Sequence, residues 1–303
     1  MIDFKPLALE DRALFEGYLQ SGGERGCEYS FVNLYLWGRQ KAAILEDCMV
    51  FFSQFNRKSV YLFPVGSGDR KTVLDAIIQD AKERGIPCRL VGLTQDDCAQ
   101  LEQLYPGRLR YHFDRDSFDY VYNIDDLADL KGRKFQRKRN HLNRFKQNNP
   151  DYRLEPICDE NLPEVEALVN HWYELRLQEN PHGDYHMERA AIKKALAQRQ
   201  ALGLEGLLLR TDAGVVAMTL GSRLREDTFD IHFEKALDIA DGAYAAINNG
   251  FARYLRDKYP EVRFLNREDD LGLEGLRKAK LSYCPDHMVE KSWAHLLEDG
   301  YDY

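Results

Sequence analysis

The alternation of apolar and polar positions in the first half of the chain predicts strands and helices in turn. Two short apolar and aromatic runs, Met49 to Phe55 and Ser59 to Val65, flank three polar residues at 56–58 and therefore predict a hairpin. A helix is expected over residues 69–84, because an aspartate begins it and a glycine and a proline follow it. Beyond it, the pattern predicts a strand at 88–92, a helix at 94–105 and a strand at 118–122.

The second half of the chain repeats this order. The expected elements are strands at 152–157, 205–211, 215–223, 228–234, 262–266 and 288–293, and helices at 162–178, 186–201, 243–258 and 274–281. Strand pairs joined by hairpins, followed by strand–helix–strand crossovers, imply a mixed sheet in each half. We place the boundary at Pro150, which gives an N-terminal domain of residues 1–150 and a C-terminal domain of residues 151–303.

Composition agrees with two ordinary globular domains. The chain has 303 residues, of which 44% are hydrophobic and 30% are charged, so each half is long enough to bury a core. No segment approaches the roughly 18 consecutive apolar residues of a transmembrane helix, and the N-terminus does not resemble a signal peptide. We therefore expect a cytoplasmic protein without a transmembrane segment. Six scattered cysteines, without metal-binding spacing, predict reduced thiols and no metal site.

One strongly basic segment stands out in this acidic chain. Lys131 to Lys146 contains eight lysines and arginines and no acid, whereas the formal net charge of the whole chain is −8. We expect the segment on a basic helix of about residues 126–148 that joins the two domains. Such a charge is either a solvated helix face or a site for an anion. The candidate anions are a nucleic acid, a phosphate-bearing cofactor, a lipid surface and an acidic face of the same fold.

Lys138 falls on the apolar arc of this helix. At 100° per residue it lies close in angle to Leu142 and Phe145, whereas Arg133 and Arg144 lie on the far side. A desolvated ammonium without a partner is costly. We therefore expect Lys138 to point inward and to meet a ligand phosphate or a carboxylate, the acidic run at 268–270 being the suspected partner.

The strand expected at 228–234 offers a row of ionisable groups. Asp230, His232 and Glu234 share one face, so the row is either the wet face of an edge strand or the wall of a cleft that supplies a base. Farther along, polar and acidic residues follow the strand expected at 262–266, which is a common place for chemistry in α/β sheets. Glu268 is a second candidate base and Tyr283 a candidate acid, unless these groups only pair with neighbouring charges.

The segment from Asp238 to Tyr244 leads directly into the helix expected at 243–258. Small residues at a helix N-terminus can admit a phosphate or a carboxyl group. Because two aspartates in this segment would oppose an anion, the segment favours a carbonyl or an amine over a pyrophosphate.

Several motifs resemble a known family. They are the run from Asp125 to Phe135, the run Lys138-Arg139-Asn140-His141-Leu142-Asn143, and the runs Asn266 to Gly272 and Gly275 to Lys280. Together they resemble, over nearly the whole chain, an uncharacterised bacterial family related to the C-terminal domain of phosphatidylglycerol lysyltransferase. The resemblance implies an α/β (α+β) fold of two tandem acyltransferase domains of GNAT type, as in the Fem peptidyltransferases, which use aminoacyl-tRNA.

The residues and the resemblance together predict an acyltransferase. It would move an aminoacyl group from aminoacyl-tRNA, or an acyl group from acyl-CoA, to an amine or hydroxyl of a small molecule or lipid headgroup. No tightly bound cofactor is expected. Asp230, Glu268 and Tyr283 are the expected catalytic residues. The residues expected to hold the phosphate-bearing donor are Lys134, Lys138, Arg139, Arg144, Asn266 and Arg267.

Three alternatives stay open. The first is a non-catalytic protein that keeps the fold and binds RNA or another anion. The second is an acyl-CoA-dependent N-acetyltransferase, although such enzymes usually carry Arg/Gln-x-x-Gly-x-Gly/Ala before a helix. The matching segment here, Asp238 to Ala243, has no basic residue and one glycine. The third is a scaffold in which the basic helix joins two acidic domains. The sequence does not indicate an oligomeric state.

Overall fold

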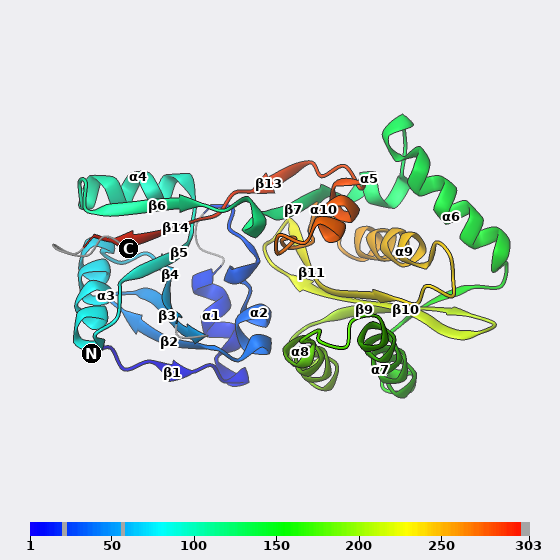
Figure 1. Ribbon diagram of the computed structural model, residues 1–303, viewed down its shortest axis with the longest axis horizontal. Coiled ribbons are helices and arrows are strands. Elements are labelled where there is room, and N and C mark those ends of the chain that lie inside the picture. Colours follow the sequence, from blue (N-terminus) through cyan, green and yellow to red (C-terminus); the bar gives the residue numbers. More distant parts are fainter. Residues whose placement is uncertain (20–22, 56–57, 298–303) are drawn as a thin grey trace. The chain divides into compact units, whose positions relative to one another are not determined.

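The computed structural model describes residues 1–19, 23–55 and 58–297, and within these ranges the chain forms two compact units (Figure 1). Unit 1 contains Met1–Asp119, Asp269–Leu273 and the described part of Val289–Tyr303, and unit 2 contains Tyr120–Glu268 and Glu274–Met288. The first boundary therefore falls after Asp119, and the expected boundary at Pro150 is wrong. The physical reason is that Leu142 and Phe145 of the basic helix are buried in the core of unit 2.

Within the described residues, unit 1 is built on a seven-stranded sheet in the order β1-β2-β3-β4-β5-β14-β6. Its strands are β1 (Lys5–Pro6), β2 (Gln40–Leu45), β3 (Cys48–Phe55), β4 (Lys58–Gly66), β5 (Arg89–Leu93), β6 (Leu109–Phe113) and β14 (Ser292–Leu296). Strands β4 and β5 run parallel, and the other neighbours pair antiparallel. The expected hairpin of β3 and β4 is confirmed, and residues 56 and 57 of its turn lie outside the described residues.

Helices cover both faces of this sheet. They are α1 (Arg12–Leu19) and α2 (Phe31–Trp37) on one face, and α3 (Arg70–Arg84) and α4 (Gln95–Leu104) on the other (Figure 1). Helix α3 begins and ends where the sequence predicts. The Asp69 carboxylate accepts a hydrogen bond from the Thr72 amide at 3.0 Å, and Gly85 ends the helix at a left-handed φ of 66°.

In the described part of unit 2, the sheet has the order β13-β7-β12-β11-β10-β9-β8. Its strands are β7 (Asp119–Asn123), β8 (Arg153–Pro156), β9 (Glu205–Thr211), β10 (Gly214–Arg223), β11 (Thr228–Ala236), β12 (Phe264–Asn266) and β13 (His287–Val289). Strands β11 and β12 run parallel, and their last matched pair is Asp230 with Asn266. Strand β12 ends at Asn266, whereas β11 continues for six residues beyond Asp230, to Ala236, so the pairing of the two strands ends there.

The helices of unit 2 also lie on both faces of the sheet. Helices α5 (Ile124–Asp129), α6 (Gln136–Asn148) and α9 (Ala243–Lys258) share one face, and α7 (Leu162–Glu179) and α8 (His186–Ala197) cover the other; α10 (Glu274–Leu281) precedes β13 (Figure 1). The Asn249 side-chain amide of α9 donates to the carbonyl oxygens of Leu127 and Ala128, each at 2.8 Å. These bonds satisfy carbonyl groups at the C-terminal end of α5.

Two expected elements are wrong. The single basic helix at 126–148 is interrupted, because Leu130 adopts a left-handed conformation (φ 51°) that ends α5, and Gly132 follows with a positive φ of 83° before α6 begins. The single strand at 288–293 is two strands in different sheets, since β13 belongs to the sheet of unit 2 and β14 lies between β5 and β6.

Both sheets combine parallel and antiparallel pairs, which confirms the expected mixed α/β fold class. Among the residues that the structure describes, no helix combines the length and apolar character that a bilayer crossing requires.

Candidate functional site

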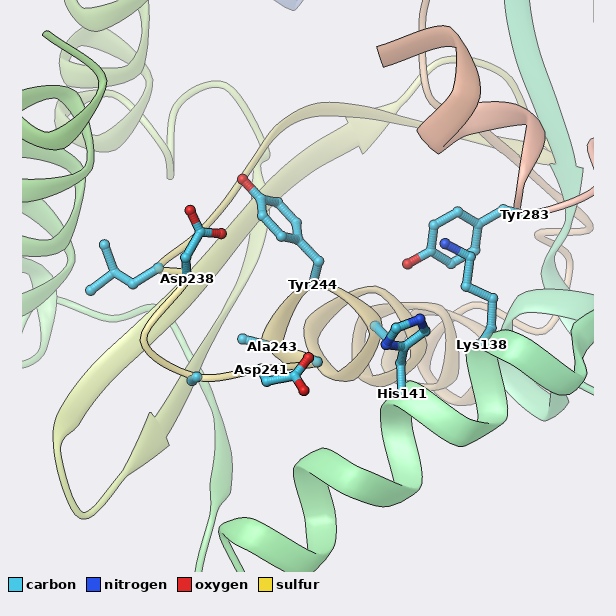
Figure 2. A pocket seen from close by; sticks show the side chains of 11 residues that line it. Lys138, His141, Asp238, Asp241, Ala243, Tyr244 and Tyr283 are labelled. Atoms are coloured by element: carbon cyan, nitrogen blue, oxygen red, sulfur yellow. The ribbon is translucent and has the colours of Figure 1, made fainter. Parts of the chain in front are cut away.

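A pocket of about 400 Å³ lies in unit 2 at the N-terminal end of α9 (Figure 2). One wall comes from α6 and from the residues after α10, and the other from the loop between β11 and α9. The polar side chains that line it are Lys138, His141, Asp238, Asp241, Tyr244 and Tyr283. The pocket therefore combines a cation, an imidazole, two carboxylates and two phenols within one unit.

The close approach of α6 and α9 at this pocket depends on Gly242. Its φ of 88° is left-handed, and a Cβ atom there would lie 2.5 Å from the carbonyl oxygen of His141. Only glycine fits this position without movement of α6. The small residues Ala243 and Ala245 of the first turn of α9 also line the pocket.

Lys138 is the basic residue that the structure places in this pocket. Its side chain is partly buried, and its ammonium lies 3.6 Å from the centre of the Tyr283 ring. Burial, and then repulsion by Arg267, lowers the pKa of Lys138 to about 8, while the charge of Glu234 opposes this shift. The lysine points inward as the helix arc predicts, but the carboxylate that supports its charge is Glu234 and not the expected acidic run.

A buried ion pair lies beside Lys138 and Tyr283. Arg267 Nη2 donates to Glu234 Oε1 at 2.8 Å, and the two side chains are only 13% and 9% exposed. The Asn248 amide of α9 donates to the other oxygen of Glu234 at 3.3 Å. The Arg267 guanidinium lies 4.9 Å from the centre of the Tyr283 ring. Burial raises the pKa of Tyr283 above its ordinary value, so this phenol stays protonated at neutral pH.

The other expected donor-binding residues are engaged by the chain itself. Lys134 pairs with Asp126 at 2.7 Å, and Arg144 pairs with Asp241 at 2.8 Å. Arg139 donates to the carbonyl oxygens of Leu130 and Gly132. Asn266 accepts a hydrogen bond from the Glu268 amide at 2.7 Å. Of the five basic residues expected to hold the phosphate-bearing donor, Lys138 is the one among the described pocket-lining residues.

The expected bases Asp230 and Glu268 do not line this pocket among its described residues, whereas Tyr283 does. Asp230 is fully buried, and its Oδ2 lies 3.5 Å from His232 Nδ1. Glu268 Oε1 lies 3.5 Å from the same nitrogen. The structure therefore brings the two expected bases together, at His232 and away from the pocket wall.

Sequence reasoning did not single out Tyr244 or Asn248 as site residues. Both lie on α9, four residues apart, so they share a face of that helix. The sequence showed Glu234 as the third polar residue on one face of a predicted strand. It could not show that Glu234 pairs with Arg267, because that contact depends on how β11 and β12 lie in the sheet.

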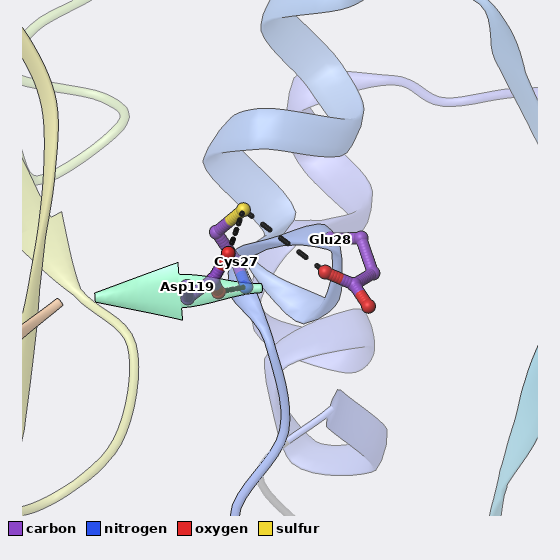
Figure 3. A group of neighbouring side chains, drawn as sticks. All are labelled: Cys27, Glu28 and Asp119. Carbon is purple, nitrogen blue, oxygen red and sulfur yellow. Dashed lines mark hydrogen bonds between the residues drawn. The ribbon is translucent and has the colours of Figure 1, made fainter. Parts of the chain in front are cut away.

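A second group of polar side chains lies in unit 1 (Figure 3). Cys27 Sγ lies 3.5 Å from Asp119 Oδ1 and 4.0 Å from Glu28 Oε2. The ammonium of Lys291 binds the same two carboxylates, at 2.7 Å from Asp119 and 3.0 Å from Glu28. The neighbouring anionic groups raise the pKa of Lys291 against the effect of burial, so its positive charge is retained.

Comparison with known proteins identifies the family of this chain. The model of the family described as "Phosphatidylglycerol lysyltransferase, C-terminal" matches residues 20–295. The chain belongs to this family. It is 39% identical to a conserved protein of unknown function from Bacteroides thetaiotaomicron, whose structure has a TM-score of 0.92, with 98% of this chain and 100% of that chain covered.

More distant structures share the fold. The structure of L-PGS from Bacillus licheniformis is 16% identical, with a TM-score of 0.69 and coverage of 96% of this chain and 93% of that one. A tandem GNAT protein from the clavulanic acid biosynthesis pathway is 10% identical, with a TM-score of 0.50 and full coverage of both chains, 100% each. The fold is thus that of tandem GNAT-like proteins, and family and fold together point to an acyltransferase.

A curated relative, an uncharacterized protein of Mycoplasmoides gallisepticum, is 27% identical over 180 residues, or 58% of this chain. The chain spans about half the length of that relative, 55%.

Proposed function

We propose that this protein is an aminoacyltransferase that binds an aminoacyl group in the pocket at the start of α9 and passes it to an amine or hydroxyl acceptor. The donor is an aminoacyl-tRNA. Membership of the phosphatidylglycerol lysyltransferase family supports the transfer of an aminoacyl group. The likeness to FemX, with a TM-score of 0.61 at 10% identity and 98% coverage of each chain, supports the fold only.

The observation that carries the proposal is the charge pattern at the start of α9. Asp238 and Asp241 flank the pocket there, and the loop offers one glycine and no basic residue. The pyrophosphate of a coenzyme A would meet two carboxylates at this helix N-terminus, whereas the ammonium of an aminoacyl ester would be attracted to them. Asp238 and Asp241 pair with Arg176 and Arg144 in exposed ion pairs. Such exposed pairs are weak and can be exchanged for a ligand.

The pocket supplies groups for direct transfer. The acceptor nitrogen or oxygen attacks the ester carbonyl, the new bond to carbon forms, and the ester C–O bond breaks. The ammonium of Lys138 stabilises the negative charge that develops on the carbonyl oxygen. Tyr283 stays protonated until it gives its proton to the departing ribose oxygen of the tRNA, and the proton that the acceptor loses then restores the phenol. No covalent enzyme intermediate is required.

The exposed basic residues next to the pocket are the proposed contact for the tRNA backbone. Four of them are exposed: Arg137 and Arg144 lie on α6, and Arg133 and Lys134 lie just before it. Each phosphate contact releases counterions, so the affinity for tRNA should fall steeply with salt.

The test combines binding and transfer. The protein is incubated with bulk tRNA charged with a mixture of radiolabelled amino acids, at about 50 and 200 mM salt, and both retained tRNA and enzyme-dependent loss of the aminoacyl ester are measured. We expect salt-sensitive retention and faster ester loss when an amine or phosphatidylglycerol vesicles are added. Tight, salt-insensitive binding of acetyl-CoA with no tRNA retained would overturn the proposal in favour of an acetyltransferase.

A further inference from the structure

A second cavity lies in unit 2, between α7 and β10, and has a volume of about 460 Å³. This volume falls within the range of small-molecule sites, roughly 300–1,000 Å³. We call it the α7 cavity. Its walls come from α7, β10 and the loop that follows β11, and most of its described lining is aliphatic. The larger apolar side chains are Leu168, Leu175, Val215, Val216, Leu237 and Ile239.

The α7 cavity follows the helix along its length. Its lining residues on α7 include Glu164, Leu168, His171 and Leu175, which are three or four positions apart and therefore share one face. The eleven positions from Glu164 to Leu175 correspond to roughly 16 Å of helix. An elongated cavity with aliphatic walls suits an extended hydrocarbon chain better than a compact ring. Ile239 lies at its edge and is 79% exposed, so apolar surface is left for a ligand to cover.

The two ends of the cavity carry one carboxylate each. At one end, Glu164 receives two hydrogen bonds from Arg210, at 2.6 and 3.0 Å. At the other end, Asp238 pairs with Arg176 at 3.1 Å. Arg176 also holds Glu179 at 2.5 Å, so its guanidinium keeps a partner when Asp238 turns to a ligand. Asp238 is therefore the carboxylate that a ligand can engage at the smaller cost.

The charge of the lining selects the head group of the ligand. Among the described residues that line the α7 cavity there is no lysine or arginine, whereas two are acidic. The nearby arginines are paired with these two carboxylates. A phosphate or carboxylate head group would meet like charge, and an ammonium would be attracted. The cavity thus fits a hydrocarbon chain that ends in an amine.

The α7 cavity adjoins the pocket at the start of α9. Leu237 and Asp238 line both of them. The Leu237 amide donates to the Val216 carbonyl oxygen at 2.9 Å, which holds the start of this loop on β10. Asp241, farther along the same loop, belongs to the described lining of the pocket at α9 alone (Figure 2). One loop therefore offers Asp241 to the aminoacyl group and Asp238 to a second ammonium.

We propose that the α7 cavity binds an aliphatic primary amine, with its chain along α7 and its ammonium at Asp238, and that this amine is the acyl acceptor. The role of acceptor rests on the proposed function, whereas binding of the amine does not. The ammonium first releases one proton to solvent, and its neutral nitrogen attacks the ester carbonyl. The C–N bond forms, the ester C–O bond breaks, and the nitrogen's next proton restores the Tyr283 phenol that protonated the ribose oxygen.

The test titrates the full chain with butylamine, octylamine and octanoate at pH 7 in a calorimeter, without tRNA. Each methylene that enters an apolar site raises affinity by roughly two- to fourfold. We therefore expect octylamine to bind at least about tenfold more tightly than butylamine. Octanoate, which has the same chain length and the opposite charge, should not bind measurably at the concentrations that saturate with octylamine.

Two variants separate the chain from the head group. Ala167 lines the cavity from an exposed position of α7, so Ala167→Trp should fill part of it and remove the preference for octylamine over butylamine. The matched control is Ala190→Trp, at an exposed position of α8 outside the described lining, which should bind octylamine as the unchanged protein does. Asp238→Asn should weaken both amines by about fivefold and keep the preference for the longer chain.

The proposal is overturned if octylamine binds no more tightly than butylamine, if octanoate binds as well as octylamine, or if Ala167→Trp and Ala190→Trp bind octylamine alike. Enzyme-dependent loss of the aminoacyl ester tests the role of acceptor separately. Faster loss with octylamine than with butylamine supports it, and equal acceleration by the two amines would overturn it while the proposed function stands. Bound octylamine without any ester loss would count against the proposed function and leave the amine site in place.

Discussion

The ammonium of Lys138 stands 3.6 Å from the centre of the Tyr283 ring, on the wall of the pocket at the start of α9. An aromatic face stabilises a cation, and more so where water is excluded. Burial nevertheless lowers the pKa of Lys138 to about 8, so its charge is held at some cost at neutral pH. A costly charge that faces a pocket is typical of a functional group.

Replacement of this lysine separates a functional role from a structural one. We expect Lys138→Met to reduce aminoacyl transfer by about 100-fold, because one donor to the developing oxyanion is lost. The free energy of unfolding at pH 7 should stay the same or rise, because an apolar side chain replaces a desolvated charge. Transfer rates and denaturant unfolding of the same preparations measure the two effects.

The control for this variant is Lys193→Met. Lys193 is exposed on α8, on the opposite face of the sheet from α9. Both transfer and unfolding should be unchanged. An equal loss of transfer in the two variants would contradict a specific role for Lys138.

The lowered pKa of Lys138 predicts a pH dependence with a definite sign. Its pKa is about 8 in the folded protein, against an ordinary value of 10.5. Between these values the unfolded chain binds a proton that the folded chain does not, so the stability contributed by this residue rises with pH. Any stability advantage of Lys138→Met at pH 7 should therefore shrink between pH 8 and 10. Denaturant unfolding at several pH values measures the difference in unfolding free energy between Lys138→Met and the unchanged protein. A difference that grows with pH would contradict a lowered pKa of Lys138.

Transfer should respond in the opposite direction. If the charged ammonium stabilises the oxyanion, transfer by the unchanged protein should fall as the pH rises through about 8. The residual transfer of Lys138→Met should lack this decline, which distinguishes a role in catalysis from a role in packing alone.

Most of the local structure of this chain could be predicted from the sequence. Asp69 and Gly85 mark the ends of α3 because each acts on its own helix terminus, through a side-chain acceptor and a left-handed backbone. The alternation from Thr228 to Glu234 predicted β11 because a strand exposes its two faces by turns. The family resemblance added the tandem arrangement of mixed sheets.

The features that could not be predicted from the sequence depend on contacts between residues far apart in the chain. The break between β13 and β14 depends on which sheet each strand joins, and the partners lie far away in the chain. The sequence predicts Asp230 as a base, but β11 lies between β12 and β10 in the sheet and the Asp230 side chain is completely buried. The role of Gly242 is visible only when α6 packs on α9, because the close contact is with His141.

The ion pair of Glu234 and Arg267 should be costly to break from either side. Glu234→Gln leaves a guanidinium buried without its counter-charge, and we expect a loss of about 3–5 kcal/mol in the free energy of unfolding. The double variant Glu234→Gln/Arg267→Met should recover much of that loss. Denaturant unfolding of the two single variants and the double variant gives the coupling energy. A double variant as unstable as the sum of the singles would show that the pair contributes little.

The place of the basic helix in unit 2 can be tested through Phe145. This residue is fully buried in the core that contains α9, so Phe145→Ala should cost about 3–5 kcal/mol. Amide hydrogen exchange should increase in α9 and leave α3 of unit 1 unchanged. The matched variant Leu74→Ala, in the core of unit 1, should have the reverse pattern. Faster exchange of α3 in Phe145→Ala would contradict the boundary after Asp119.

Two glycines with similar backbones isolate the close contact at the pocket. Gly38 and Gly242 both have left-handed conformations, with φ and ψ of 62° and 18° at Gly38 and of 88° and 2° at Gly242. Alanine at either position strains the backbone by about 1–2 kcal/mol. At Gly38 no heavy atom lies within 4 Å of the added Cβ, whereas at Gly242 the Cβ would lie 2.5 Å from the His141 carbonyl oxygen and 3.0 Å from Phe145 Cβ. Since these atoms belong to α6, Gly242→Ala must also push that helix away from α9. We expect Gly242→Ala to lose clearly more unfolding free energy than Gly38→Ala and to bind the aminoacyl donor more weakly. Equal losses in denaturant unfolding would mean that α6 moves aside freely, and the close packing of α6 on α9 would then not define the pocket.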